Sequence, residues 1–239
     1  GVQTCALPIY KDEDEDENED EDGSIMDLDS EEGAIAVAAF AGIEAENVNT
    51  GSIIRADLDR SGLFRTLDPS RLPGRPASSA EMLPGVWQNI GADLVVIGQA
   101  TRLANGKYSF RYELLRKGGL ERLLGESFTV DASRWRDAAH YISDKIYEKV
   151  TGEPGIFATK ILYVNQYSRG GKPRYRLELS DIDGERQITL LDSVEPILSP
   201  TWSPTARQVA YVSFESRKAV VYVQDVLSGK RRVVANFRG

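Results

Sequence analysis

The only histidine, His140, is the first candidate for acid–base chemistry. On the helix expected around it, it lies about 100° or more from the apolar stripe, beside Arg136 and Tyr147. A general base needs a positioned substrate and an orienting partner, and a serine triad needs a better-placed histidine. The sequence also has no Gly-x-x-x-x-Gly-Lys loop, His-Glu-x-x-His motif or Gly-x-Ser-x-Gly elbow. We therefore predict a structural surface histidine and no catalytic residue.

Metal-binding patterns are weak. The run Asp181-Ile182-Asp183-Gly184 is similar to the start of a calcium loop, but it lacks the third ligand position and the distal glutamate. A hairpin turn is the better interpretation. The single cysteine, Cys5, excludes a Cys-based zinc site and an internal disulfide. We predict neither a metal nor a cofactor.

One basic cluster has the composition of a nucleic-acid interface. Its members are Arg169, Lys172, Arg174 and Arg176, with Tyr167 and Tyr175 nearby. They straddle a Gly-Gly turn and alternate into a predicted strand. The pattern favours a solvated hairpin, and we expect no nucleic-acid partner.

The acidity of the chain is concentrated near its start. Asp12 to Asp22 holds ten acids and one Asn, and four more acids follow before Gly33. The rest of the chain, without these fourteen acids and Lys11, contains 23 acids and 28 Lys and Arg and has a net charge of +5. Such dense like charge predicts that residues 1–33 are a disordered acidic tail or an artefact. No apolar run of about 18 residues exists, so we expect no membrane insertion.

Residues 34–156 are predicted to form an α/β or α+β domain in the order β-α-β-α-β-β-β-α. Asn47 or Asn49 can cap its first helix, and Ser79 a short second one. Asn105-Gly106 predicts a two-residue hairpin turn. The last helix carries one apolar stripe at helical spacing, formed by Trp135, Ala139, Ile142, Ile146 and Val150.

Residues 157–239 are predicted to be about two blades of a β-propeller. Ile161–Val164 is matched by Val209–Val212, Leu177–Asp181 by Val221–Asp225, and the turn at Asp183 by that at Ser228, with offsets of 48, 44 and 45 residues. A period near 45 is typical of four-stranded blades. Because a ring needs at least four blades, we expect this propeller to be incomplete and the chain to be a fragment.

Several motifs resemble one family, the TolB proteins of Gram-negative bacteria. They are Ser193-Val194-Glu195-Pro196-Ile197-Leu198-Ser199-Pro200-Thr201-Trp202-Ser203-Pro204, the stretch Val209 to Ser216 and the ending Gly229 to Gly239. Upstream, Ile54-Arg55-Ala56-Asp57-Leu58, Ser61-Gly62-Leu63-Phe64 and Gly91 to Gln99 match as well. The resemblance covers about Gly33 to Gly239 in continuous order, which makes the set specific.

The resemblance implies a non-catalytic periplasmic scaffold of the Tol-Pal system, with an N-terminal α/β domain and a six-bladed propeller. It implies that the propeller binds the lipoprotein Pal and that the N-terminal segment binds TolA, for outer-membrane integrity and invagination at cell division. Ile25, Met26 and Leu28 could stand in for that TolA-binding segment.

This sequence departs from the family in three places. It shows no signal peptide, the acidic run replaces or obscures the N-terminal segment, and Thr205-Ala206 replaces the usual Asp-Gly of a blade turn. Most of the Pal-binding surface would lie on blades beyond Gly239. Two alternatives stay open: the propeller domain of a prolyl-peptidase-like hydrolase, and a cytosolic protein that binds partners through its acidic arm.

Overall fold

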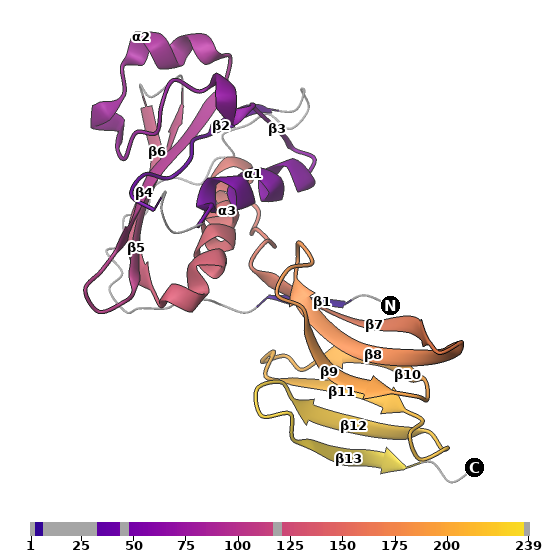
Figure 1. Cartoon of the computed structure of the whole chain (residues 1–239). Helices are drawn as coiled ribbons and strands as arrows, with labels where there is room; N and C mark the ends of the chain where they lie inside the picture. The colour runs from indigo at the N-terminus through magenta and orange to yellow at the C-terminus, as the bar shows by residue number, and fades with distance from the viewer. Residues whose placement is uncertain (1–2, 7–32, 44–47, 117–120, 237–239) are drawn as a thin grey trace. The chain divides into compact units, whose positions relative to one another are not determined.

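The computed structural model of the chain describes residues 3–6, 33–43, 48–116 and 121–236 (Figure 1). They fall into two compact units. The N-terminal unit spans Asp12–Phe157, and the propeller unit comprises Gly1–Lys11 and Ala158–Gly239. No helix among the described residues is long and apolar enough to cross a membrane.

A five-stranded mixed sheet forms the centre of the N-terminal unit. Its order is β3 (Phe64–Thr66), β2 (Gly33–Val37), β4 (Leu94–Arg102), β5 (Tyr108–Arg116) and β6 (Glu121–Val130). β2 pairs in parallel with β3 on one side and with β4 on the other, whereas β4, β5 and β6 are antiparallel neighbours. The apolar centre of β4 is buried on both faces, as expected for a strand covered on both sides.

Two long helices cover one face of this sheet, α1 (Thr50–Arg60) and α3 (Trp135–Thr151) (Figure 1). The Asn49 side chain caps α1 by accepting from the Ser52 N–H at 3.2 Å, which confirms one of the two predicted caps. Gly152 ends α3 in the left-handed conformation, as its position after the apolar stripe predicts.

The second face of the sheet is covered by the segment between β3 and β4. Trp87, Met82 and Leu67 pack there against Val95 and Ile97. The helix predicted from Ser79 to Trp87 is wrong in detail. The segment forms a 3-10 turn at Ser79–Glu81 and the four-residue α2 (Pro84–Trp87). Pro84 has no N–H to donate, so a helix that began at Ser79 could not continue through it. Further 3-10 turns lie at Pro69–Arg71, Gln88–Ile90 and Ala132–Arg134.

The propeller unit consists of two four-stranded antiparallel sheets, each with the strand count of a propeller blade. The first orders β1 (Gln3–Ala6), β7 (Thr159–Arg169), β8 (Lys172–Asp181) and β9 (Ile188–Ser193). The second orders β10 (Ile197–Trp202), β11 (Gln208–Ser213), β12 (Val220–Asp225) and β13 (Arg231–Asn236). They share a core of Leu162, Leu177, Leu179, Ile197, Val209 and Tyr211. The predicted fold class, an α/β domain followed by about two blades, is confirmed.

The first strand differs from the expected acidic tail over 1–33. Gln3–Ala6 pairs antiparallel with Thr159–Leu162 of β7, so the outer strand of the first sheet comes from the start of the chain. An edge strand offers a row of unpaired backbone groups, and any extended segment can use them. Residues 7–32, which hold the acidic run, lie outside the described residues.

One turn differs from its prediction. At Asn105-Gly106 the hairpin exists, but only Gly106 has a positive φ, and Leu103 N–H donates to Lys107 O across a three-residue loop. Ser199 and Pro200 lie inside β10 at a register shift, with Ser199 at φ 50°. Gly118-Gly119, a dipeptide typical of turns, lies outside the described residues.

Candidate functional site

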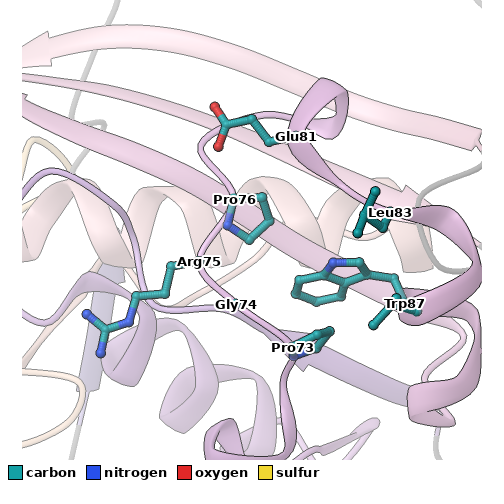
Figure 2. A pocket seen from close by; sticks show the side chains of 8 residues that line it. Pro73, Gly74, Arg75, Pro76, Glu81, Leu83 and Trp87 are labelled. Atoms are coloured by element: carbon teal, nitrogen blue, oxygen red, sulfur yellow. The ribbon is translucent and has the colours of Figure 1, made fainter.

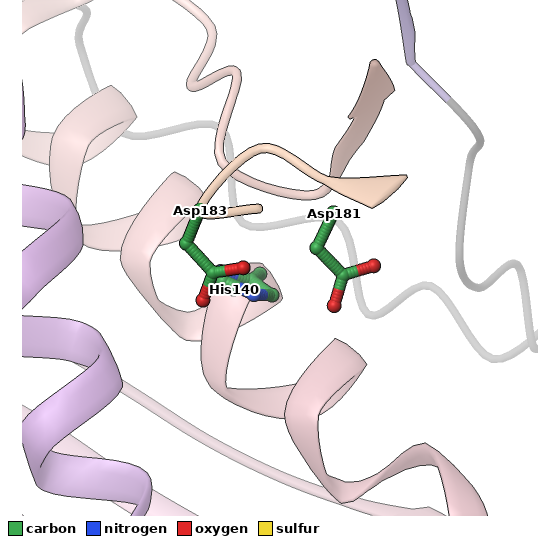
Figure 3. Close-up of side chains that lie close together, drawn as sticks. All are labelled: His140, Asp181 and Asp183. Atoms are coloured by element: carbon green, nitrogen blue, oxygen red, sulfur yellow. The ribbon is translucent and has the colours of Figure 1, made fainter. Parts of the chain in front are cut away.

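His140 is buried, which corrects the prediction of a surface histidine (Figure 3). It projects from α3 and is 2% exposed, and its Nδ1 lies 2.7 Å from the Asp57 carboxylate on α1. A carboxylate only accepts, so Nδ1 carries the proton. The prediction failed because α3 packs against α1 as well as against the sheet, so a wider arc of α3 is buried than its apolar stripe indicates.

Asp57 is the acceptor at the centre of this network. The Ser143 hydroxyl donates to the same Asp57 oxygen at 2.9 Å, and Arg60 donates to the other oxygen at 3.0 Å. Both Asp57 and Ser143 are fully buried. Sequence reasoning missed Asp57, although its place between Ile54 and Leu58 on the apolar face of α1 was a signal. A carboxylate on such a face needs buried partners.

The chemistry of this network is structural. A serine nucleophile must donate to the histidine, but the single proton of the Ser143 hydroxyl is shared between Asp57 and the Ala139 carbonyl, the latter at 3.1 Å. His140 is hydrogen-bonded to Asp57 as a triad histidine is to its aspartate, but Ser143 contacts the aspartate rather than the histidine. The arrangement joins α1 to α3 across the buried helix interface.

Asp181 and Asp183 lie at the end of β8 and in the turn that follows (Figure 3). Gly184 N–H donates to Asp181 O at 3.0 Å, which confirms the predicted hairpin turn. The Asp181 carboxylate pairs with Lys160 and, at 2.7 Å, with Arg186. Burial alone would raise the pKa of Asp181, but the hydrogen bonds from Arg186 and Lys160 outweigh it and lower the pKa.

The basic cluster is confirmed as a hairpin, formed by β7 and β8. Two of its arginines are held by one carboxylate. Asp192 on β9 accepts from Arg174 at 2.6 Å and 3.0 Å, from Arg176 at 2.9 Å and from the Tyr167 hydroxyl at 2.8 Å. These hydrogen bonds, Arg174 first, hold the pKa of Asp192 well below its usual value. The positive charge available to a polyanion is correspondingly smaller.

A shallow cavity of about 310 Å³ lies over α2 (Figure 2). Trp87 forms its floor, and Leu83 and Val86 beside it are 69% and 47% exposed. Its other walls come from the loop Pro73 to Pro76 and from Glu81, whose carboxylate accepts from the Ala77 N–H at 3.0 Å. The lining is open and mixes apolar side chains with those of Arg75 and Glu81, and it contains no serine, cysteine, histidine or lysine.

Comparison with known proteins assigns these units. The model of the TolB amino-terminal domain matches residues 24–116, and that of the TolB beta propeller domain matches residues 147–239. The Tol-Pal system protein TolB of Polaromonas sp. (strain JS666) is 44% identical over 205 residues, which are 86% of this chain and 47% of that protein. The chain belongs to the TolB family.

Other members of the TolB family agree. The Tol-Pal system protein TolB of Chromobacterium violaceum is 42% identical over 206 residues, again 86% of this chain and 47% of that protein. The crystal structure of TolB from Acinetobacter baumannii superposes with a TM-score of 0.77 at 33% identity, covering 100% of this chain and 53% of that one. The chain thus spans about half the length of the TolB relatives it matches. Ile25, Met26 and Leu28, the predicted TolA-binding residues, lie outside the described residues.

Proposed function

We propose that this chain acts in the periplasm as part of a non-catalytic scaffold of the Tol-Pal system. The observation that carries the proposal is the 44% identity, over 86% of the chain, to a protein named for that system. At this identity the fold is shared, whereas function rests on the sites that the fold presents. The scaffold would link TolA and Pal, and so support outer-membrane integrity and invagination at cell division.

A non-catalytic role agrees with the chemistry of the described residues. The one buried serine–histidine–aspartate set has its serine on the aspartate and not on the histidine. In the first blade, Asp192 forms ion pairs with both Arg174 and Arg176.

Two partner sites belong to the proposal. Pal would bind the propeller, and TolA would bind the N-terminal segment, for which Ile25, Met26 and Leu28 are our candidates. Three apolar side chains within a strongly acidic stretch could pair with a partner strand as an added edge. Neither a nucleic acid nor direct insertion into a membrane is part of the function we propose.

The test uses a hybrid, because the chain spans half of its relatives. In TolB of Chromobacterium violaceum, the stretch that corresponds to residues 24–239 of this chain is replaced by those residues, and the purified hybrid is mixed with immobilised Pal and, separately, with TolA. We expect Pal to retain the hybrid as it retains the parent. A second hybrid, with Ile25, Met26 and Leu28 each changed to Ser, should keep Pal binding and lose TolA binding.

Three outcomes would contradict the proposal. A folded hybrid that binds neither partner removes the scaffold role, and unchanged TolA binding by the triple-serine hybrid removes the three candidate residues. Peptidase activity would instead favour the prolyl-peptidase-like alternative, although the given sequence contains no Gly-x-Ser-x-Gly elbow. Recovery of the protein from the cytosol would favour the acidic-arm alternative.

A further inference from the structure

One end of the propeller unit presents exposed cations on two neighbouring turns. The turn between β7 and β8 carries Arg169 and Lys172, and the turn between β11 and β12 carries Arg217 and Lys218. The four side chains are exposed, and none of them forms a hydrogen bond or an ion pair with another described residue. β7 and β8 occupy the same places in the first sheet as β11 and β12 in the second, so the two turns lie at the same end of the unit (Figure 1).

The connection from β9 to β10 joins the two turns into one surface. On one side, Asp192 near the end of β9 accepts from Arg174, close to the first turn. On the other side, the N–H of Phe214, the first residue of the second turn, donates to Pro196 O at 3.2 Å. Between these contacts Val194 is 61% exposed. We call this surface the basic end, and it comprises Arg169, Lys172, Val194, Arg217 and Lys218.

The carboxylates near the basic end do not cancel its charge. Asp192 is held by two arginines of β8, as described above, and Glu215 accepts from Arg231 at 2.6 Å. Glu195 is then the remaining carboxylate of the two turns and the connection, against four cations without a partner among the described residues. The surface therefore combines an excess of positive charge with an apolar side chain at its centre.

Arg217 occupies a backbone position that favours glycine. Its φ is 60°, in the left-handed region, where a Cβ costs free energy. The corresponding turn of the first sheet has Gly170 and Gly171 there, at φ 60° and 75°. Arg186, at φ 50°, is held by an ion pair with Asp181, but the Arg217 side chain contacts no polar partner in the described chain. Backbone strain without a structural partner is typical of residues that serve a function.

We propose that the basic end binds an acidic segment of a protein partner. Carboxylates of that segment would pair with the four cations, and an apolar side chain would lie against Val194. Protein interfaces usually combine an apolar centre with a polar rim in this way. The apolar centre favours a protein over a nucleic acid, whose phosphates would use the cations alone. The proposal rests on these residues and stands whether or not the chain links TolA and Pal.

Amide-resolved NMR titration of the full chain tests this with a synthetic peptide in which four glutamates flank one leucine. We expect saturable shifts at millimolar concentration, centred on Gly170, Val194 and Lys218, and weaker binding as the salt concentration rises. The same peptide with glutamine in place of each glutamate should not bind. A chain in which the ten acids of Asp12–Asp22 are changed to their amides is titrated in parallel, so that this acidic run cannot mask the surface.

The Arg217→Gly variant separates partner binding from folding. It should melt at a higher temperature, because glycine relieves the strain at φ 60°. It should also bind the peptide about threefold more weakly, the loss expected when one exposed ion pair is removed. The matched control is Arg207→Gly, which removes an exposed arginine from the turn between β10 and β11 and should leave peptide binding unchanged.

Several results would overturn the proposal. Neither chain giving saturable shifts at the three amides overturns it, and so does equal binding of the glutamine peptide. An Arg217→Gly variant that melts higher but binds the peptide as tightly as the wild type overturns the role of Arg217. Tighter binding of a DNA duplex than of the peptide overturns the assignment to an acidic protein.

Discussion

Replacing Asp57 by alanine should loosen the contact between α1 and α3. The variant removes the shared acceptor of His140, Ser143 and Arg60. A buried donor left without a partner costs about 1–3 kcal/mol. The cost falls mostly on the His140 Nδ1–H, because Ser143 can still donate to Ala139 O and Arg60 is 41% exposed.

We therefore expect Asp57→Ala to lower the free energy of unfolding of the N-terminal unit by about 3 kcal/mol. The assay is urea denaturation followed by the far-UV helical signal, since α1 and α3 are the two long helices among the described residues and both belong to this unit. Asp57→Asn, which keeps one oxygen as acceptor, should cost less.

The control is Asp131→Ala. Asp131 is 63% exposed at its side chain and pairs with Lys107 at 3.6 Å, a surface contact that contributes about 0–1 kcal/mol. If Asp57→Ala were no more destabilising than this control, the buried network would not hold the two helices together, and our account of His140 would be refuted.

Three further predictions concern single residues. Asp192→Asn should reduce stability at neutral pH. Because the pKa of Asp192 is lower in the folded than in the unfolded chain, its carboxylate stabilises the fold above the unfolded pKa of about 4, and this stabilisation is lost as the pH falls toward the folded pKa. The melting temperatures of variant and wild type should therefore converge in acid. Arg217→Gly should increase the free energy of unfolding by about 1 kcal/mol and so raise the melting temperature, because Arg217 has φ 60° and an exposed side chain. Lys218→Gly, the control, should not raise it. Gly98→Ala should destabilise the chain by about 1–3 kcal/mol in urea melts, since its Cβ would lie 2.5 Å from an aromatic ring and 2.7 Å from a backbone oxygen, while Gly74→Ala meets nothing within 4 Å and should be neutral.

Local sequence signals determined most of the N-terminal unit. The stripe from Trp135 to Val150 predicted α3, and the apolar run in Leu94–Ile97 predicted β4. In each element the spacing of the apolar residues matches the positions that the structure buries. The Ser79–Trp87 segment was mispredicted, since Pro84 divides it in two. The repeat near 45 residues indicated the blades because each blade has the same four strands and therefore needs apolar residues at corresponding positions.

What the sequence did not predict depends on long-range partners. The residues around Gln3–Ala6 do not predict a strand, because the pairing of β1 depends on β7, which begins more than 150 residues later. His140 was placed at the surface because a single-helix pattern cannot show a second helix packed beside it.

The central claim is that the chain performs the work of its TolB relatives, and rescue of the outer-membrane barrier tests it most directly. The measurement is leakage of a periplasmic enzyme from a Chromobacterium violaceum strain that lacks TolB and carries the hybrid described above. We predict leakage as low as with the parent TolB. The Asp57→Ala hybrid should leak more in proportion to its loss of folded protein. Leakage equal to that of the deletion strain, from a hybrid that is folded and exported, would contradict the claim.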